Sequence, residues 1–111
     1  MINILLDECI PKKLKFRIDE LDPAFFVKTV PEMGWASFTN GDLLSVSEED
    51  FDVFITSDKN LSFQQSVSKT SMHIILLKAK TNTYKDLLPL VKKLSPYVKN
   101  HSPNSFTEIE Y

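Results

Sequence analysis

The sequence predicts an α/β fold in which a mostly parallel sheet is covered by helices on both faces. Short apolar runs alternate along the 111-residue chain with segments of helical spacing, and this alternation is typical of strand–helix–strand units. The composition is 42% hydrophobic and 25% charged, which is that of an ordinary folded domain. Neither a repeat nor a linker interrupts the pattern. We therefore expect a single domain over residues 1–111.

The first half of the chain contains three predicted strands and two predicted helices. The strands are apolar and β-branched or aromatic runs at residues 2–6, 25–30 and 51–56. The first helix is indicated by Pro11, which suits a first turn, and by apolar side chains at helical spacing that end before Asp22-Pro23. No period holds over 31–39, which predicts a loop. Asn40 is then expected to cap a short helix that runs to about residue 49.

The second half of the chain predicts further helices and two more strands. A short helical turn is expected through Phe63–Gln65, and a buried fourth strand at His73–Leu77. The apolar stripe of Tyr84–Lys99 is typical of an amphipathic helix, with a kink or an early stop near Pro96. Residues 106–111 alternate apolar and polar side chains, which predicts a half-exposed edge strand.

Charge and composition exclude several classes of function. The chain has 13 basic and 15 acidic residues, so it lacks the basic excess of a nucleic-acid coat protein. Its two glycines, Gly34 and Gly41, cannot form a dinucleotide fingerprint or a phosphate-binding loop. One cysteine and two histidines build neither a disulfide framework nor a zinc finger. No apolar run approaches the roughly 20 residues that span a bilayer, so we expect a cytoplasmic protein with no membrane contact.

Acidic residues gather where the predicted strands end. Asp7 and Glu8 follow the first strand, and Asp58 follows the third. The helix that begins near Asn40 runs antiparallel to the third strand, which brings Asp42 to the same edge. Ligands of parallel sheets bind in the crevice beyond the carboxyl ends of the strands. The sequence therefore predicts a cluster of carboxylates in that crevice.

Clustered carboxylates repel one another unless a cation lies between them. Ligands that are all oxygen favour Mg²⁺ or Mn²⁺ over zinc, and such ions act together with substrate phosphates. In phosphodiester hydrolysis the ion activates water and neutralises charge on the leaving oxygen. The alternative interpretation is that Asp7, Asp42 and Asp58 are three independent helix caps.

Four segments carry a resemblance to a known family: Ile4–Pro11, Thr29–Ala36, Asn40–Leu44 and Phe51–Leu61. Together they resemble the PIN-like domain family of small bacterial proteins, which are often described as the toxin components of toxin–antitoxin systems. The resemblance extends in order from residue 1 to about residue 95. It implies a PIN-like three-layer α/β/α sandwich and a Mg²⁺- or Mn²⁺-dependent endoribonuclease.

The resemblance also implies roles for individual residues. Asp7, Asp42 and Asp58 would be the catalytic metal ligands, with Glu8 as an additional ligand. The sequence departs from the family at Asn60, where many PIN-like proteins have another acid, so the site has one charge fewer. The expected partners are RNA and an antitoxin protein, and a homodimer is expected.

Basic and amide side chains beside the acids are candidates for substrate binding. Lys12, Lys13 and Lys59 could hold RNA phosphates. Asn60 and Gln64 are expected to contact the substrate beside Asp58.

For several other residues the sequence favours a structural role over a functional one. Lys15 and Arg17 are expected on a solvated helix face. Trp35 and Phe38 could stack on unpaired bases, but they are expected to cover a small satellite core. Elsewhere in the chain, His73 is expected to be a structural histidine and Cys9 a small buried hydrophobe.

Two alternative functions remain open. A degenerate PIN-like module would bind RNA or a protein without cleaving, which Asn60 permits. A phosphoacceptor receiver domain has acids after its first and third strands, but it also needs a fifth parallel strand ending in lysine. It further needs a serine or threonine at the end of the fourth strand, where this chain has Leu77-Lys78.

Overall fold

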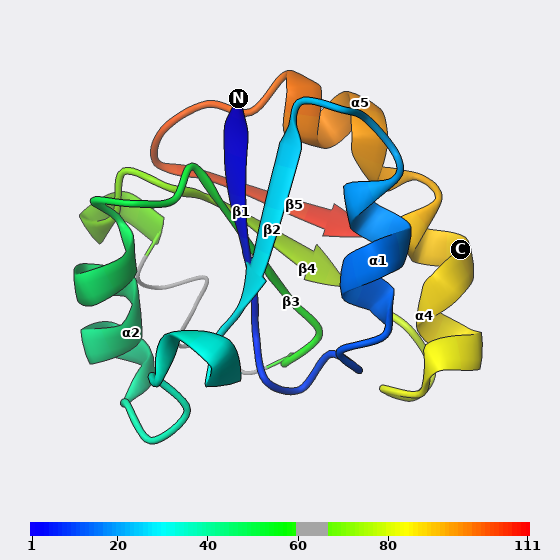
Figure 1. The fold of residues 1–111 in the computed structure, drawn as a ribbon, viewed down its shortest axis with the longest axis horizontal. Coiled ribbons are helices and arrows are strands. Elements are labelled where there is room, and N and C mark those ends of the chain that lie inside the picture. The colour runs from blue at the N-terminus through cyan, green and yellow to red at the C-terminus, as the bar shows by residue number, and fades with distance from the viewer. Residues whose placement is uncertain (60–66) are drawn as a thin grey trace.

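A five-stranded sheet lies at the centre of the computed structural model, which describes residues 1–59 and 67–111. Its strands are β1 (Ile2–Leu6), β2 (Phe25–Thr29), β3 (Val53–Thr56), β4 (His73–Leu77) and β5 (Ser105–Ile109). They lie in the order β2-β1-β3-β4-β5, and every neighbouring pair is parallel (Figure 1). The predicted parallel sheet is therefore confirmed, including the half-exposed edge strand near the end of the sequence.

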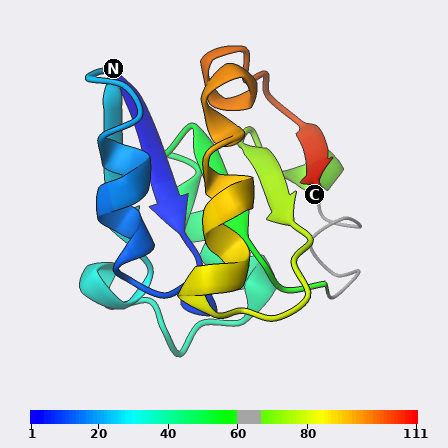
Figure 2. The same ribbon diagram turned by 90° about the vertical axis from the view of Figure 1, so that its right-hand side faces the viewer.

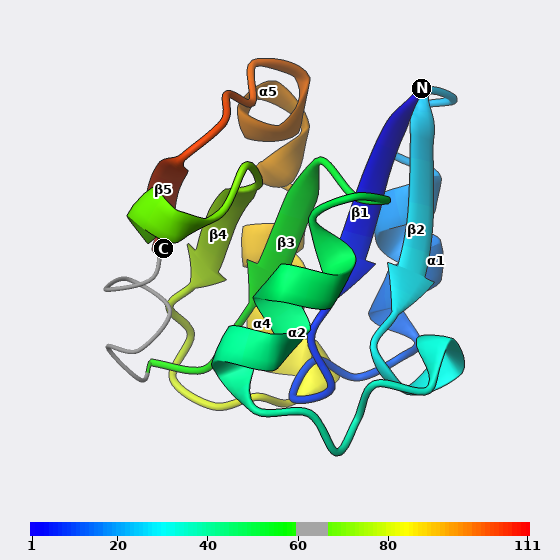
Figure 3. The ribbon, with the colours of Figure 1, turned by 90° about the vertical axis from the view of Figure 1, so that its left-hand side faces the viewer.

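Helices cover both faces of the sheet, as the sequence predicts. The helical elements are α1 (Leu14–Asp19), η1 (Pro31–Met33), α2 (Asn40–Ser47), η2 (Val67–Lys69), α4 (Tyr84–Val91) and α5 (Leu94–Lys99). Helices α1, α4 and α5 lie on one face (Figure 2), and α2 lies on the other (Figure 3). Among these described helices, none has the length and apolar character needed to cross a bilayer.

The two faces of the sheet bury separate apolar cores because successive side chains of a strand point to opposite faces. On β1, Ile4 and Leu6 pack with the helices of the α1 face, whereas Leu5 packs with the α2 face. Phe54 of β3 and Ile74 of β4, both fully buried, complete the core under α2. Burial on both faces explains why the central strands read as continuous apolar runs.

The amphipathic stripe over 84–99 forms two helices rather than one. Helix α4 ends at Val91 and α5 begins at Leu94. A continuous helix would place the ring of Pro96 against the carbonyl group of Lys92, four residues earlier. The predicted interruption is therefore confirmed, but it lies before Pro96, which occupies the first turn of α5.

The segment between β2 and β3 differs from the prediction in two details. The predicted loop over 31–39 contains the turn η1, which ends at Gly34 with a φ of 80°. The cap of α2 is Thr39 and not Asn40: the Thr39 hydroxyl accepts the backbone N–H of Asp42 at 3.2 Å. Thr39 is extended, as a capping residue must be, whereas Asn40 is already helical. The turn predicted through 63–65 lies outside the described residues.

Candidate functional site at the carboxyl edge of the sheet

The candidate site lies where the order of the strands reverses. From β1 the chain crosses to β2 on one side of the sheet, whereas β3, β4 and β5 continue on the other side. Open α/β sheets of this order bind ligands at the carboxyl ends of the two strands that flank the reversal, here β1 and β3. Asp7 directly follows β1, and Ser57 and Asp58 directly follow β3. The two strands thus bring Asp7, Ser57 and Asp58 to the same edge of the sheet.

Asp7 is a buried carboxylate whose orientation is fixed by hydrogen bonds. Its side chain belongs to a residue that is only 8% exposed. Oδ1 accepts the backbone N–H of Glu8 at 2.8 Å, and Oδ2 accepts the hydroxyl of Thr56 at 2.7 Å. The thiol of Cys9 donates a longer contact of 3.5 Å to Oδ2. These donors compensate for the loss of water around a buried acid.

Thr56 connects Asp7 to the segment that follows β3. Its hydroxyl oxygen donates to Asp7 and accepts the backbone N–H of Asp58 at 3.0 Å. Thr56 was not among the predicted site residues. The available signal was a polar residue directly after the apolar run Val53–Ile55, at the point where the strand ends.

Cys9 and Ser57 form the side of the site next to Thr56. The Ser57 hydroxyl donates to Sγ of Cys9 at 3.2 Å, and the Cys9 sulfur lies 3.6 Å from the Thr56 hydroxyl. Burial raises the pKa of the Cys9 thiol, and the charge of Asp7 raises it further. The thiol therefore stays protonated at neutral pH, which is unfavourable for a nucleophile. The prediction of a small buried hydrophobe is confirmed only in part: Cys9 is half-buried and packs against the core on the α1 face, but its sulfur also has polar partners.

The acids expected to hold a metal ion are brought together only in part. Asp58 is half-buried and shares Thr56 with Asp7, whereas Glu8 is exposed. Asp42 is exposed in the first turn of α2, which begins at the carboxyl edge of the sheet (Figure 3). Over residues 1–59 and 67–111, no three His, Cys, Asp or Glu side chains lie close enough to hold one ion.

Two carboxylates of the site could serve as ligands of a divalent ion. Asp7 and Asp58 are two candidate oxygen ligands, and the remaining positions around Mg²⁺ or Mn²⁺ would be filled by water and by phosphate oxygens of the substrate.

Comparison of the chain with protein-family models, with curated proteins and with solved structures found no match. The function of the site is accordingly inferred from its own residues.

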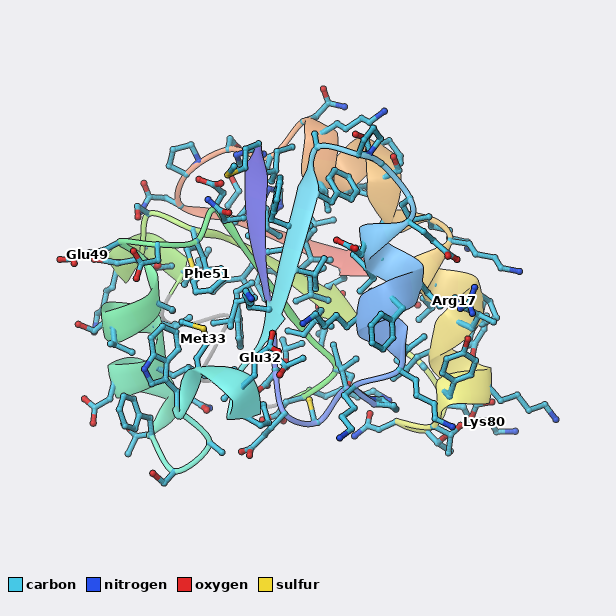
Figure 4. All side chains as sticks on the ribbon, viewed as in Figure 1. Arg17, Glu32, Met33, Glu49, Phe51 and Lys80 are labelled. Carbon is cyan, nitrogen blue, oxygen red and sulfur yellow. The ribbon has the colours of Figure 1, made fainter. Side chains whose placement is uncertain are left out.

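The predicted phosphate-binding lysines lie on two sides of the site. Lys12 and Lys13 are exposed in the segment that leads from Asp7 into α1. Lys59 donates to the carbonyl oxygen of Ala79 at 2.9 Å and lines a polar hollow of about 290 Å³. Lys80 lines the same hollow (labelled in Figure 4). Asn60 and Gln64, the two predicted amide contacts, lie outside the described residues.

Two basic residues of α1 have structural partners. Lys15 forms an ion pair of 2.9 Å with Glu32, and Arg17 forms one of 2.7 Å with Glu20. Although burial acts to raise the pKa of Glu32, hydrogen bonds from Lys15 and from the backbone N–H of Thr29 lower that pKa below its usual value. The predicted solvated face is confirmed for Arg17, which is exposed, whereas Lys15 is half-buried by its pairing with Glu32.

Trp35 and His73 have the structural roles that the sequence favoured, whereas the prediction for Phe38 is wrong: Phe38 is 41% exposed and does not belong to the core under α2. Trp35 packs edge-to-face on Phe51, with ring centroids 6.1 Å apart, and contributes to the core under α2. His73 is buried: one ring nitrogen accepts the backbone N–H of Ser102 at 3.3 Å, and the other lies 2.7 Å from the Thr107 hydroxyl. Both rings are therefore structural.

Proposed function

We propose that this chain is a PIN-like endoribonuclease that depends on Mg²⁺ or Mn²⁺, with its site at the carboxyl ends of β1 and β3. The observation that carries the proposal is the buried carboxylate of Asp7, which Thr56 links to Asp58 at the reversal of strand order. The resemblance to the PIN-like family supports the same residues. It also supports a toxin role and an antitoxin partner, whereas the homodimer stays a prediction.

Each residue has a defined task in this proposal. Asp7 and Asp58 would hold the ion, and the Thr56 hydroxyl keeps the Asp7 carboxylate in one orientation. When bound, the ion would neutralise charge on the phosphodiester and make a water molecule more acidic. Lys12, Lys13 and Lys59 would hold the neighbouring phosphates. Metal ligation by Asp42 and Glu8 stays a prediction, as does substrate contact by Asn60 and Gln64.

Two measurements on the same variants test the proposal. Millimolar Mn²⁺ should raise the melting temperature of the wild-type chain by mass action, and the chain should cleave a mixed RNA pool only with the ion. Asp58→Asn should abolish cleavage and reduce the thermal shift while leaving the circular dichroism spectrum unchanged. Asp7→Asn should also reduce the shift, because it removes a proposed ligand.

A matched control separates the site from general electrostatics. Asp50 is an exposed acid beyond α2, so Asp50→Asn should keep both the thermal shift and the cleavage. A wild-type melting temperature that does not change with Mn²⁺, together with absence of cleavage, would contradict the metal-dependent nuclease.

A second candidate function is a PIN-like module that binds RNA or a protein without catalysis. It is favoured by the finding that the described residues offer no group of three metal ligands. This candidate predicts RNA binding that is unchanged by Mn²⁺ and no cleavage.

A receiver domain is less well supported. The fifth strand is parallel and the strand order is that of receivers. However, β5 ends at Ile109 and β4 at Leu77, so the lysine and the hydroxyl side chain that a receiver has at these ends are lacking among the described residues.

A further inference from the structure

Phe16 is an aromatic side chain that α1 presents to solvent. It is 64% exposed, whereas Leu14 and Ile18 on the same helix are fully buried. The helix therefore buries its apolar stripe without Phe16. Core packing does not explain a phenyl ring at this position.

The ring of Phe16 stands between two hollows in the surface. The first, of about 480 Å³, is also lined by Lys12, Lys13 and Thr29. The second, of about 550 Å³, is lined by Lys13, Phe16, Arg17 and Tyr84. Because Phe16 and Lys13 line both hollows, we treat the two as one α1 groove.

The α1 groove follows the carboxyl edge of the sheet. One end lies at Thr29 and Pro31, where β2 ends, and the other lies at Tyr84, where α4 begins after β4. Figure 4 shows Glu32 near the end of β2 and Arg17 on α1 toward α4. The groove thus runs past the segment that connects Asp7 to α1.

The lining of the α1 groove is strongly basic. It contains the cations Lys12, Lys13, Lys15 and Arg17 and the single acid Glu32. Lys15 is paired with Glu32, and Arg17 donates to the Tyr84 hydroxyl at 3.1 Å and pairs with Glu20. Within the described parts of the chain, Lys12 and Lys13 have no ion pair.

We propose that the α1 groove binds single-stranded RNA, with an unpaired base stacked on Phe16 and phosphates held by Lys12 and Lys13. The proposal takes RNA from the proposed function but does not require cleavage. A groove that combines cations with an exposed ring is what single-stranded nucleic acid needs, since every base has a face to stack. An acidic peptide could pair with the lysines but has no flat base to stack on Phe16, so it is the alternative that the test below separates from RNA.

The test measures binding of a fluorescently labelled single-stranded RNA of mixed sequence by anisotropy, in EDTA so that no cleavage occurs. Phe16→Ala should weaken binding roughly 5- to 150-fold, the range found when a stacking aromatic is removed. Phe16→Trp should preserve affinity. The matched control is Phe26→Ala: Phe26 is 48% exposed on β2 and points to the opposite face of the sheet from Val27, which packs under α1. That control should leave affinity unchanged.

A salt series tests the lysines separately. The double variant Lys12→Gln, Lys13→Gln should lower the slope of log affinity against log salt by about 1.4, or about 0.7 per phosphate contact on a single strand. Fully paired RNA of the same length should compete poorly, because its bases are not free to stack on Phe16.

The outcomes distinguish the groove from the nuclease site. If Phe16→Ala binds single-stranded RNA as tightly as the wild type, or loses no more than Phe26→Ala, the proposal is wrong. It is also wrong if a peptide rich in Glu and Leu binds more tightly than RNA and depends on Phe16. Loss of RNA binding in Phe16→Ala with no Mn²⁺-dependent cleavage by the wild type would retain the groove and reject the nuclease.

Discussion

The hydroxyl group of Thr56 donates a hydrogen bond of 2.7 Å to Oδ2 of Asp7, across the pairing of β3 with β1. The same oxygen accepts the backbone N–H of Asp58. Thr56 is fully buried and Asp7 is only 8% exposed. Water therefore has little access to this hydrogen bond. One hydroxyl group therefore holds together the parts of the candidate site that follow two different strands.

Replacing Thr56 by valine should destabilise the chain by about 1–3 kcal/mol, because it leaves a buried acceptor on Asp7 and the N–H of Asp58 without their partner. Chemical denaturation measures this loss. A double-mutant cycle of Thr56→Val with Asp7→Ala should give a coupling energy of about 0.5–3 kcal/mol. The cycle of Thr107→Val with Asp7→Ala is the control: Thr107 lies on β5, three strands from β1, and these two changes should add. Additivity in the Thr56 cycle as well would contradict the link.

Stability should fall as the pH decreases below about 6.5, the ordinary pKa of histidine. Burial lowers the pKa of His73, and the charge of His101 lowers it further. As the pH falls, the unfolded chain therefore takes up a proton on His73 before the folded chain does. The contribution of His73 to the free energy of unfolding is fully present above about pH 6.5 and is lost as the pH falls through the lower pKa of the folded state. Urea denaturation between pH 7.5 and about pH 5 measures it.

The variant His73→Gln should flatten this pH dependence, whereas His101→Gln should retain most of it. The pKa values of Asp22 and Glu32 lie below their ordinary values, so these carboxylates stay ionised over the same range. Parallel curves for the wild type and His73→Gln would show that another group is responsible.

Removing the helix cap of α2 should cost about 1 kcal/mol. Thr39→Ala leaves the backbone N–H of Asp42 without its side-chain acceptor. Thr83 caps α4 in the same way, through the N–H of Asp86, so Thr83→Ala should cost a similar amount. Thr39→Ser keeps the acceptor and should be nearly neutral in thermal denaturation. Equal losses in Thr39→Ser and Thr39→Ala would assign the effect to packing of the threonine methyl group.

Much of the fold could be predicted because its strands are locally encoded. The runs Ile2–Leu6 and His73–Leu77 have the predicted bounds, since both are mostly apolar and are buried over Ile4–Leu6 and over the whole of His73–Leu77. Element ends set by single contacts could not be predicted. The end of α4 depends on where the ring of Pro96 meets the preceding turn, and the start of α2 depends on whether Thr39 or Asn40 is extended.

The candidate site was predictable to the level of the sheet edge. Strand ends placed Asp7 and Asp58 there, but the contact through Thr56 depends on register. Leu6 pairs with Ile55, so the next residues, Asp7 and Thr56, face each other. A shift of one residue would abolish this contact without changing the apolar pattern. The position of Asp42 depends on the loop before α2, in which no sequence period holds.

The all-parallel sheet also has a consequence for how the chain folds. Parallel neighbours cannot be joined by a tight hairpin, so each pairing must wait for a crossover to close, which makes folding slow for a chain of this size. Among the described strands, β5 comes last along the sequence. Until β5 pairs, β4 presents the unpaired apolar run His73–Leu77 as an open edge. During synthesis, this open strand edge is therefore prone to association with other chains.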